Sequence, residues 1–137
     1  MNLFVDTSVW SLAFRRNSPS SAAVVQALIR AIEAGETIFA TGLVLQELLQ
    51  GFSGPKDRKQ ILDRFTAVPL IVPDREDYVS AAELRNRCRR AGIQAATIDA
   101  LLAQLCLHHD LTMLTADDDF RHIASQCKLK LWSERSS

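Results

Sequence analysis

The chain has 137 residues, of which 47% are hydrophobic and 23% are charged, and its formal net charge is zero. The length and composition fit a globular domain with its own core, and the neutral balance disfavours a generic nucleic-acid-binding module, which normally carries a basic excess. No apolar run reaches the roughly 18 residues of a membrane helix, and the first ten residues contain an acid and no basic stretch, unlike a signal peptide.

The first half of the chain alternates short apolar runs with helical patterns. In chain order, its predicted elements are a strand over 3–5, a helix over 7–14, a helix that begins at Ser18-Pro19 and closes at Gly35, a strand over 37–41, and helices over 43–50 and 56–67. Serine before proline is a typical helix start, because the hydroxyl caps the helix and proline lacks only an N–H that would be unpaired there. Short apolar runs between helices indicate buried strands of a parallel sheet.

The second half continues the alternation. Its predicted elements are a strand over 68–72, a helix over 74–91 that ends before Gly92, a helix over 97–107 capped by Thr97, a strand over 112–115, a short helix over 117–124, and a strand over 129–132. No repeat, linker or low-complexity tract interrupts the pattern. The sequence therefore predicts one α/β domain over 1–137, a three-layer α/β/α sandwich with a mainly parallel central sheet, and a frayed tail at 133–137.

Four acidic residues fall where such a sheet would form a ligand crevice. Asp6 directly follows the first predicted strand, and Asp117 follows the strand over 112–115 after one spacer. Ligands of open parallel sheets bind beyond the carboxyl ends of the strands, where the strand order switches. Asp99 lies in the first turn of a helix, and Glu47 lies within an otherwise apolar helix. If the two strands are neighbours, the four carboxylates can converge.

Converging carboxylates need a cation. Two of them about 4 Å apart repel by about 4 kcal/mol at an effective dielectric constant near 20, so one would bind a proton at neutral pH unless a divalent metal relieves the repulsion. Mg²⁺ and Mn²⁺ prefer oxygen ligands and promote phosphodiester hydrolysis by activating water and stabilising the departing oxyanion. Structural explanations stay open as well: Asp6 and Asp117 could be helix caps, Asp99 could complement a helix dipole, and Glu47 could face solvent.

Four segments around these acids resemble the motifs of the PIN-domain nucleases, and specifically the VapC-type toxins of bacterial toxin–antitoxin pairs. They are VDTSVW at 5–10, LVLQELLQG at 43–51, TIDALLAQLC at 97–106 and LTADDDF at 114–120, in the order in which the family carries them. The resemblance implies a PIN-like fold, cleavage of RNA that depends on Mg²⁺ or Mn²⁺, a homodimer, and inhibition by a cognate antitoxin protein.

The resemblance also implies roles for single residues. The implied catalytic set is Asp6, Glu47, Asp99 and Asp117. Within it, Asp6, Asp99 and Asp117 would bind the metal, and Glu47 would orient the metal-bound water or a second cation. Further positions that match the family pattern are Asp119, Thr115, Thr7 and Ser8. Asp118 falls where the pattern tolerates many residues, so we do not assign it to the site.

Several other features allow a functional and a structural interpretation. The basic runs over 56–59 and 85–90, the second of which begins with Arg85, could contact RNA phosphates at the rim of the site or simply lie on solvated helix faces, and Arg15 and Arg16 are similar candidates. The helices over 43–50 and 55–67 could form a groove for an antitoxin segment or belong to ordinary core packing. The three histidines are expected to be neither ligands nor bases. The three widely spaced cysteines indicate reduced thiols in a cytoplasmic protein.

Two further functions stay open at this stage. A phosphatase of the haloacid dehalogenase type also places an aspartate after its first strand, but it needs a second acid two residues later, where this chain has Ser8. A receiver-like or degenerate binding module would use the same acids only to stabilise the fold or to hold a structural ion. Metal-dependent cleavage of RNA would separate the nuclease from both.

Overall fold

The computed structural model describes residues 2–15 and 22–134. The strands in these ranges are β1 (Leu3–Val5), β2 (Ile38–Thr41), β3 (Leu70–Ile71), β4 (Thr112–Leu114) and β5 (Lys130–Leu131). The helices are α1 (Thr7–Phe14), α2 (Ala23–Glu33), α3 (Gly42–Gly51), α4 (Pro55–Phe65), α5 (Arg75–Arg90), α6 (Thr97–His108) and α7 (Asp119–Ala124).

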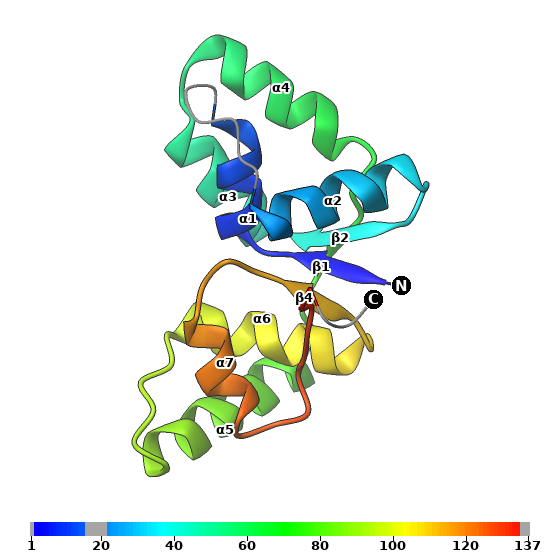
Figure 1. Ribbon diagram of the computed structural model, residues 1–137. Coiled ribbons are helices and arrows are strands. Elements are labelled where there is room, and N and C mark those ends of the chain that lie inside the picture. Colours follow the sequence, from blue (N-terminus) through cyan, green and yellow to red (C-terminus); the bar gives the residue numbers. More distant parts are fainter. Residues whose placement is uncertain (1, 16–21, 135–137) are drawn as a thin grey trace.

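The five strands form one parallel sheet in the order β3-β2-β1-β4-β5. Helices α1 to α4 cover one face of this sheet and helices α5 to α7 cover the other, as Figure 1 shows. The predicted three-layer α/β/α sandwich is therefore confirmed. The chain builds outward from β1 to β3, then returns to place β4 on the opposite side of β1, so the strand order switches between β1 and β4.

The central strands are buried because helices cover both faces of the sheet. Phe4 and Val5 of β1 and Met113 and Leu114 of β4 are completely inaccessible to solvent. In β1 and β4, Val5 pairs with Leu114 in register, so these two strands end side by side. This shared end is where the polar residues that follow each strand meet.

Several predicted boundaries differ from the structure. The predicted helix start at Ser18-Pro19 lies outside the described residues, and α2 begins at Ala23 after an extended Ala22. The predicted cap at Thr97 is wrong: Ala96 is the extended N-cap residue and Thr97 is already helical. Likewise the predicted helix from Asp117 begins only at Asp119, because residue 117 belongs to a polar turn after β4. The end of the tail predicted to fray, 135–137, also lies outside the described residues.

Two predicted strands are shorter than expected. The run over 68–72 contributes only Leu70–Ile71, and the run over 129–132 contributes only Lys130–Leu131. Both strands lie at the edges of the sheet and pair on one side only. An edge strand has one partner to extend its ladder, so apolar composition alone overestimates its length.

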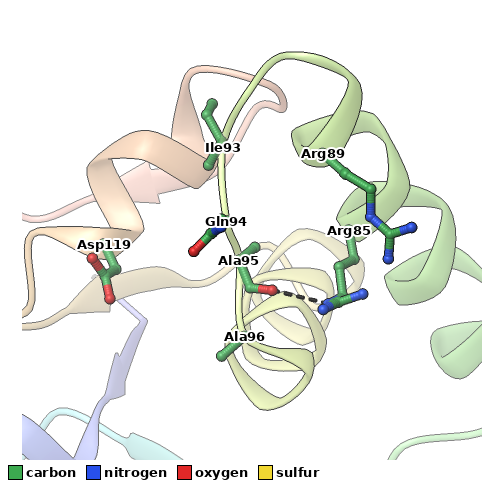
Figure 2. A pocket seen from close by; sticks show the side chains of 7 residues that line it. All are labelled: Arg85, Arg89, Ile93, Gln94, Ala95, Ala96 and Asp119. Atoms are coloured by element: carbon green, nitrogen blue, oxygen red, sulfur yellow. Dashed lines mark hydrogen bonds between the residues drawn. The ribbon is translucent and has the colours of Figure 1, made fainter.

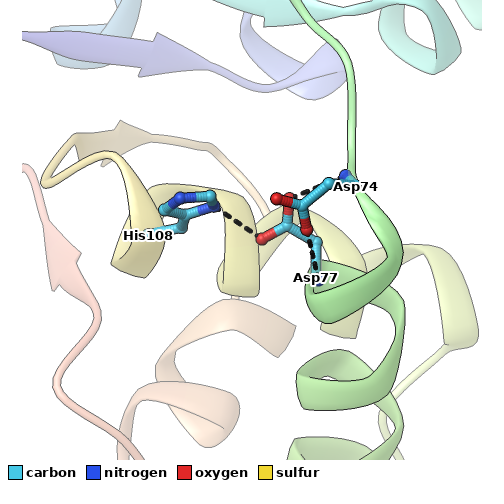
Figure 3. Close-up of side chains that lie close together, drawn as sticks. All are labelled: Asp74, Asp77 and His108. Atoms are coloured by element: carbon cyan, nitrogen blue, oxygen red, sulfur yellow. Dashed lines mark hydrogen bonds and ion pairs between the residues drawn. The ribbon is translucent and has the colours of Figure 1, made fainter.

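Helix α5 starts with a hydrogen-bonded cap that also binds the end of α6. The backbone N–H of Asp77 donates to Asp74 Oδ1 over 2.8 Å, and the N–H of Asp74 donates to Asp77 Oδ2 over 3.0 Å. His108 Nδ1 lies 2.7 Å from Asp77 Oδ1 (Figure 3). Burial raises the pKa of Asp77, but hydrogen bonds from the Asp74 backbone, His108 and Gln104 outweigh it and hold that pKa below its ordinary value. His108 thus has a structural partner in the capping residue Asp77.

The remaining sequence expectations concern the membrane and the thiols. Within 2–15 and 22–134, no helix combines the length and apolar character that crossing a membrane requires. Cys88, Cys106 and Cys127 are all free thiols. Burial, with a smaller contribution from the charge of Asp6, strongly raises the pKa of Cys106, so this thiol is protonated and unreactive in the folded protein.

Candidate metal centre and active site

Asp6 lies at the point where β1 turns into α1. Its backbone N–H donates to the carbonyl oxygen of Leu114 over 3.0 Å and so continues the β1–β4 ladder. The residue is only 7% exposed. Its carboxylate forms no capping hydrogen bond with α1; instead, Oδ2 accepts hydrogen bonds from Ser8 Oγ at 2.7 Å and Thr115 Oγ1 at 2.9 Å. Asp6 is thus the N-cap residue of α1 by position, as considered from the sequence, but its side chain does not cap the helix.

The two hydroxyls that hold Asp6 are themselves held by backbone donors. The N–H of Ala116 donates to Ser8 Oγ over 2.9 Å, and the N–H of Asp117 donates to Thr115 Oγ1 over 3.0 Å. Each hydroxyl accepts from the chain and donates its proton to Asp6. This network ties the turn after β4 to the start of α1 and keeps the carboxylate of Asp6 in one orientation.

Three further carboxylates meet beside this network. The side-chain oxygens of Asp99, Asp117 and Asp119 lie within 4.8 Å of one another. Asp99 comes from the first turn of α6, Asp117 from the turn after β4, and Asp119 from the start of α7. The N–H of Asp119 donates to Asp117 Oδ1 over 2.9 Å, which fixes the spacing of these two acids. Three elements thus bring together acids that are up to 20 positions apart in the sequence.

The ionisation of Asp99 reflects both its burial and its acidic neighbours. Partial burial, followed by the negative charges of Asp6, Asp117, Asp119 and Glu47, raises the pKa of Asp99 from its ordinary value of 3.8 to about 6. A position in the first turn of a helix would by itself favour the charged carboxylate. Desolvation and the surrounding charges raise the pKa of Asp99 in spite of this position at the start of α6.

Glu47 lies on the exposed face of α3 and still belongs to the same electrostatic field. Thr7 Oγ1 donates a hydrogen bond to Glu47 Oε1 over 3.0 Å, which links α1 to α3. The charge of Glu47 contributes to the raised pKa of Asp99. Glu47 therefore lies on the wet face of its helix, outside the group formed by Asp99, Asp117 and Asp119, while its charge still acts on Asp99.

The donor chemistry of this cluster fits a hard divalent cation. All the available ligand atoms are carboxylate oxygens, the type that Mg²⁺ and Mn²⁺ prefer. A bound cation would also remove the repulsion that raises the pKa of Asp99. Asp118 is different, because it is mostly exposed and its Oδ1 lies 3.7 Å from Nε of Arg121, as expected for a surface residue.

A cavity of about 560 Å³ adjoins the acids and contains one of the predicted rim residues. Arg85 lines it together with Arg89, Gln94 and Asp119, as Figure 2 shows. Asp119 therefore belongs to both the acidic cluster and the cavity. The other rim candidates have no such place: Arg15 is an exposed residue after α1, and Arg16 lies outside the described residues.

Sequence reasoning underestimated two features of the site. Thr7 and Ser8 match the same motif, but only Ser8 contacts Asp6 and the turn after β4, whereas Thr7 turns to Glu47. The direction of each side chain depends on its rotation around α1, which the motif does not reveal. Gln94 was not singled out, and Arg89 was expected only as one member of the basic run over 85–90; it lies four positions after Arg85 and therefore on the same helix face.

Comparison with known proteins places the fold in a family. The family model described as PIN domain matches residues 3–126. This chain belongs to the PIN domain family. No curated protein matches the chain significantly in sequence.

Solved structures share the PIN fold over nearly the whole chain. VapBC2 from Rickettsia felis, bound to a DNA fragment from its promoter, gives a TM-score of 0.73 at 20% identity and covers 96% of this chain and 98% of that one. VapBC-1 from nontypeable Haemophilus influenzae gives a TM-score of 0.74 at 14% identity and covers 97% of this chain and 98% of that one. Mycobacterium tuberculosis VapC20, a sarcin-ricin loop cleaving toxin, gives a TM-score of 0.63 at 18% identity and covers 87% of this chain and 92% of that one.

Membership of the PIN domain family decides between the two enzyme classes left open by the sequence. PIN domains are nucleases, and the acidic cluster of this chain agrees with that class. The haloacid dehalogenase alternative is wrong, because it belongs to another fold family and needs an acid where Ser8 instead donates a hydrogen bond to Asp6.

Proposed function

We propose that this PIN domain protein is a metal-dependent endoribonuclease and the toxin of a type II toxin–antitoxin pair. The observation that carries the proposal is the convergence of Asp99, Asp117 and Asp119, within 4.8 Å of one another, beside the hydrogen-bonded carboxylate of Asp6. The resemblance of VapC20, whose name specifies cleavage of the sarcin-ricin loop, supports RNA as the substrate.

The acidic residues would bind the metal ion, and neighbouring hydroxyl groups would orient one of them. Asp6, Asp99 and Asp117 would hold Mg²⁺ or Mn²⁺, and the position of Asp119 supports it as a further ligand. When bound, the ion supplies Lewis-acid activation of the phosphodiester and of water. Ser8 and Thr115 keep the carboxylate of Asp6 directed into the site.

Glu47 has a separate role in this proposal. Thr7 orients the Glu47 carboxylate through a 3.0 Å hydrogen bond, and Glu47 stays exposed to solvent. An accessible, oriented carboxylate can accept a hydrogen bond from the attacking water and align it with the phosphorus atom. It could equally contribute to a second cation once the negatively charged substrate has entered.

The proposed regulation involves an antitoxin protein, as the sequence resemblance implies. The similar VapBC structures are named as toxin–antitoxin pairs, which supports such a partner here. A cavity of about 580 Å³ between α1 and α4 is lined by Phe14, Gln60 and Arg64 among others. It lies against α4, one of the two helices proposed to form the groove, and its other wall comes from α1 and not from α3. We infer that an antitoxin segment packs there and that the complex acts in the cytoplasm.

We also infer a homodimer, for which the exposed apolar surface offers support. Val72, Tyr78, Val79 and Ile98 are large apolar residues exposed by 40% or more; they lie just before α5, in its first two turns or in the first turn of α6, and Tyr78 and Ile98 line one cavity. Apolar side chains grouped in this way are typical of a protein interface. Light scattering coupled to size-exclusion chromatography would test it: a monomer of 15.3 kDa at micromolar concentration would contradict the homodimer.

The direct test of the proposed activity is cleavage of a labelled RNA by the purified protein. We expect cleavage with Mg²⁺ or Mn²⁺, none with EDTA, and a loss of at least a hundredfold in Asp6→Ala and Asp99→Ala. Asp118→Ala is the matched control, because Asp118 neighbours the cluster without belonging to it, and it should retain near wild-type activity. Equal degradation by wild type and both site variants would indicate a contaminant. A wild type that binds metal but cleaves nothing would favour the non-catalytic binding module.

A further inference from the structure

We propose that Arg85 and Arg89 form a phosphate-binding subsite that holds the RNA strand beside the acidic cluster. This inference rests on the proposed nuclease function, because it assigns a place to a neighbouring phosphate of the same substrate. Both arginines line the cavity of about 560 Å³ that Asp119 also lines. Its volume lies within the roughly 300–1,000 Å³ of typical ligand sites.

The two arginines project from one face of α5. They are four positions apart, so their side chains lie next to each other along the helix. Figure 2 shows them on one side of the segment over 93–96 and Asp119 on the other side. A strand that leaves the acids would therefore cross the small side chains of Ala95 and Ala96 before it reaches the guanidinium groups.

Arg85 is already oriented for this role. It is half-buried, and its Nε donates a hydrogen bond to the carbonyl oxygen of Ala95 over 2.9 Å (Figure 2). That bond uses one of the five N–H donors of the guanidinium and leaves the two terminal nitrogens for an acceptor in the cavity. A guanidinium held in this way loses little conformational freedom when it binds phosphate.

The charge of this pair has no neutralising partner among residues 2–15 and 22–134: neither Arg85 nor Arg89 forms an ion pair with an acidic side chain there. Like charges four positions apart on a helix destabilise it slightly, and an anionic ligand would remove this repulsion. Arg87, on another face of α5, instead donates from Nη1 to the carbonyl oxygen of Gln126. Arg85 and Arg89 differ from Arg87 in that both line the cavity.

RNA fits this cavity better than an acidic protein segment does. The cavity carries cationic groups near one side and a carboxylate of the metal cluster on the other. Successive phosphates of one RNA strand can reach both sides of the cavity. One phosphate would approach the carboxylates once a metal ion is bound there, and a neighbouring phosphate would approach the arginines. The side chains of an acidic peptide have no comparable reason to approach Asp119.

The test is the affinity of full-length protein for a fluorescent single-stranded RNA, measured by anisotropy. All variants carry Asp99→Asn so that the RNA stays intact. We expect Arg89→Ala to weaken binding about tenfold and to reduce the slope of log affinity against log salt by about 0.7, the value for one lost phosphate contact on a single strand. Arg85→Lys keeps the charge but replaces the planar guanidinium, whose Nε bonds Ala95 while its terminal nitrogens stay available, by a single ammonium group, so it should also weaken binding.

Arg90→Ala is the matched control, since Arg90 is an exposed arginine at the same end of α5 and does not line the cavity. It should change the affinity less than twofold. Arg89 is exposed, so Arg89→Ala should unfold at the wild-type temperature. If Arg89→Ala and Arg85→Lys bind RNA with the same affinity as the control, the subsite is refuted. This holds even if the two variants lose affinity for an acidic protein, because the arginines would then bind a protein partner and not RNA.

Failure of the subsite can be told apart from failure of the proposed function. In the chain without Asp99→Asn, metal-dependent RNA cleavage with an unchanged KM in Arg89→Ala would refute the subsite alone. A wild type without metal uptake by calorimetry and without cleavage would refute the nuclease function. A raised KM with an unchanged kcat in Arg89→Ala would support a residue that binds the strand away from the reacting phosphate.

Discussion

Replacing Asp99 by asparagine should stabilise the metal-free protein at neutral pH. In the wild type, burial and four neighbouring carboxylates raise the pKa of Asp99 from 3.8 to about 6. Because a tenfold change in an ionisation equilibrium corresponds to about 1.4 kcal/mol, keeping this group charged costs at most about 3 kcal/mol of folding free energy. Solvent screening of a partly accessible group reduces the expected gain in Asp99→Asn to about 1–2 kcal/mol.

The pH dependence follows from the direction of this pKa shift. A carboxyl group with a raised pKa in the folded state binds more protons folded than unfolded, so stability falls as pH rises from about 4 through about 6. At pH 7.5 the asparagine variant should therefore unfold about 3–8 °C above the metal-free wild type. Below about pH 4 the two proteins should unfold together, because Asp99 is then protonated in both states.

Adding Mg²⁺ should reverse the order of stability. A ligand at 100 times its dissociation constant stabilises the folded state by about 2.7 kcal/mol, and the asparagine variant loses one charged ligand of the cluster. The assay is thermal or urea unfolding of both proteins at pH 5 and 7.5, with EDTA or Mg²⁺. Asp118→Asn is the control, since its exposed carboxylate lies next to Arg121.

Two outcomes would refute the electrostatic reasoning. One is a metal-free Asp99→Asn protein that is less stable than wild type at pH 7.5, which would show that Asp99 forms favourable contacts in the absence of metal. The other is equal stabilisation of both proteins by Mg²⁺, which would place the cation away from Asp99.

Three further predictions concern other parts of the fold. Ser8→Ala removes a hydrogen bond to Asp6, so kcat for RNA cleavage should fall about tenfold, while the free energy of unfolding measured in urea should fall by only about 1 kcal/mol. Asp77→Ala should lower the unfolding free energy by about 2–3 kcal/mol, whereas the control Glu76→Ala in the same turn should lower it by about 0.5 kcal/mol or less. The stabilisation by Asp77 should disappear as pH falls below its lowered pKa. With a disulfide reagent at pH 8, Cys127 should react before Cys106, whose raised pKa and burial protect it; equal rates in folded protein would contradict the buried position.

Local sequence signals were sufficient where a structure depends on neighbouring residues. Asp74 and Gly92 mark the two ends of α5 in the sequence, and the structure has a capping box at the first and a left-handed φ of 80° at the second. Buried parallel strands are similarly visible as short apolar runs. Edge strands and the helix start near Thr97 were less predictable, because a missing pairing partner and the backbone conformation of Ala96 leave no mark in composition.

The acids of the site show where sequence spacing stops being informative. The positions of Asp6 and Asp117 after two strands predicted a shared crevice only if those strands were neighbours, and the pairing of β1 with β4 met that condition. The rotation of α6 and α7 against the sheet decides whether Asp119 or Asp6 lies closer to Asp99. The rotation of α1 decides whether Thr7 or Ser8 contacts Asp6. That rotation is set by packing between residues distant in the chain.

The sequence by itself determined the fold class, the residue types of the site and its resemblance to PIN domains, because hydrophobic periodicity, caps and motif order are properties of contiguous residues. Only the tertiary structure decided which carboxylates share one field, which hydroxyls orient Asp6, and that Arg85 and Arg89 line a cavity that Asp119 also lines. These features arise between elements joined by long connections, and their distances follow from how the helices pack on the sheet.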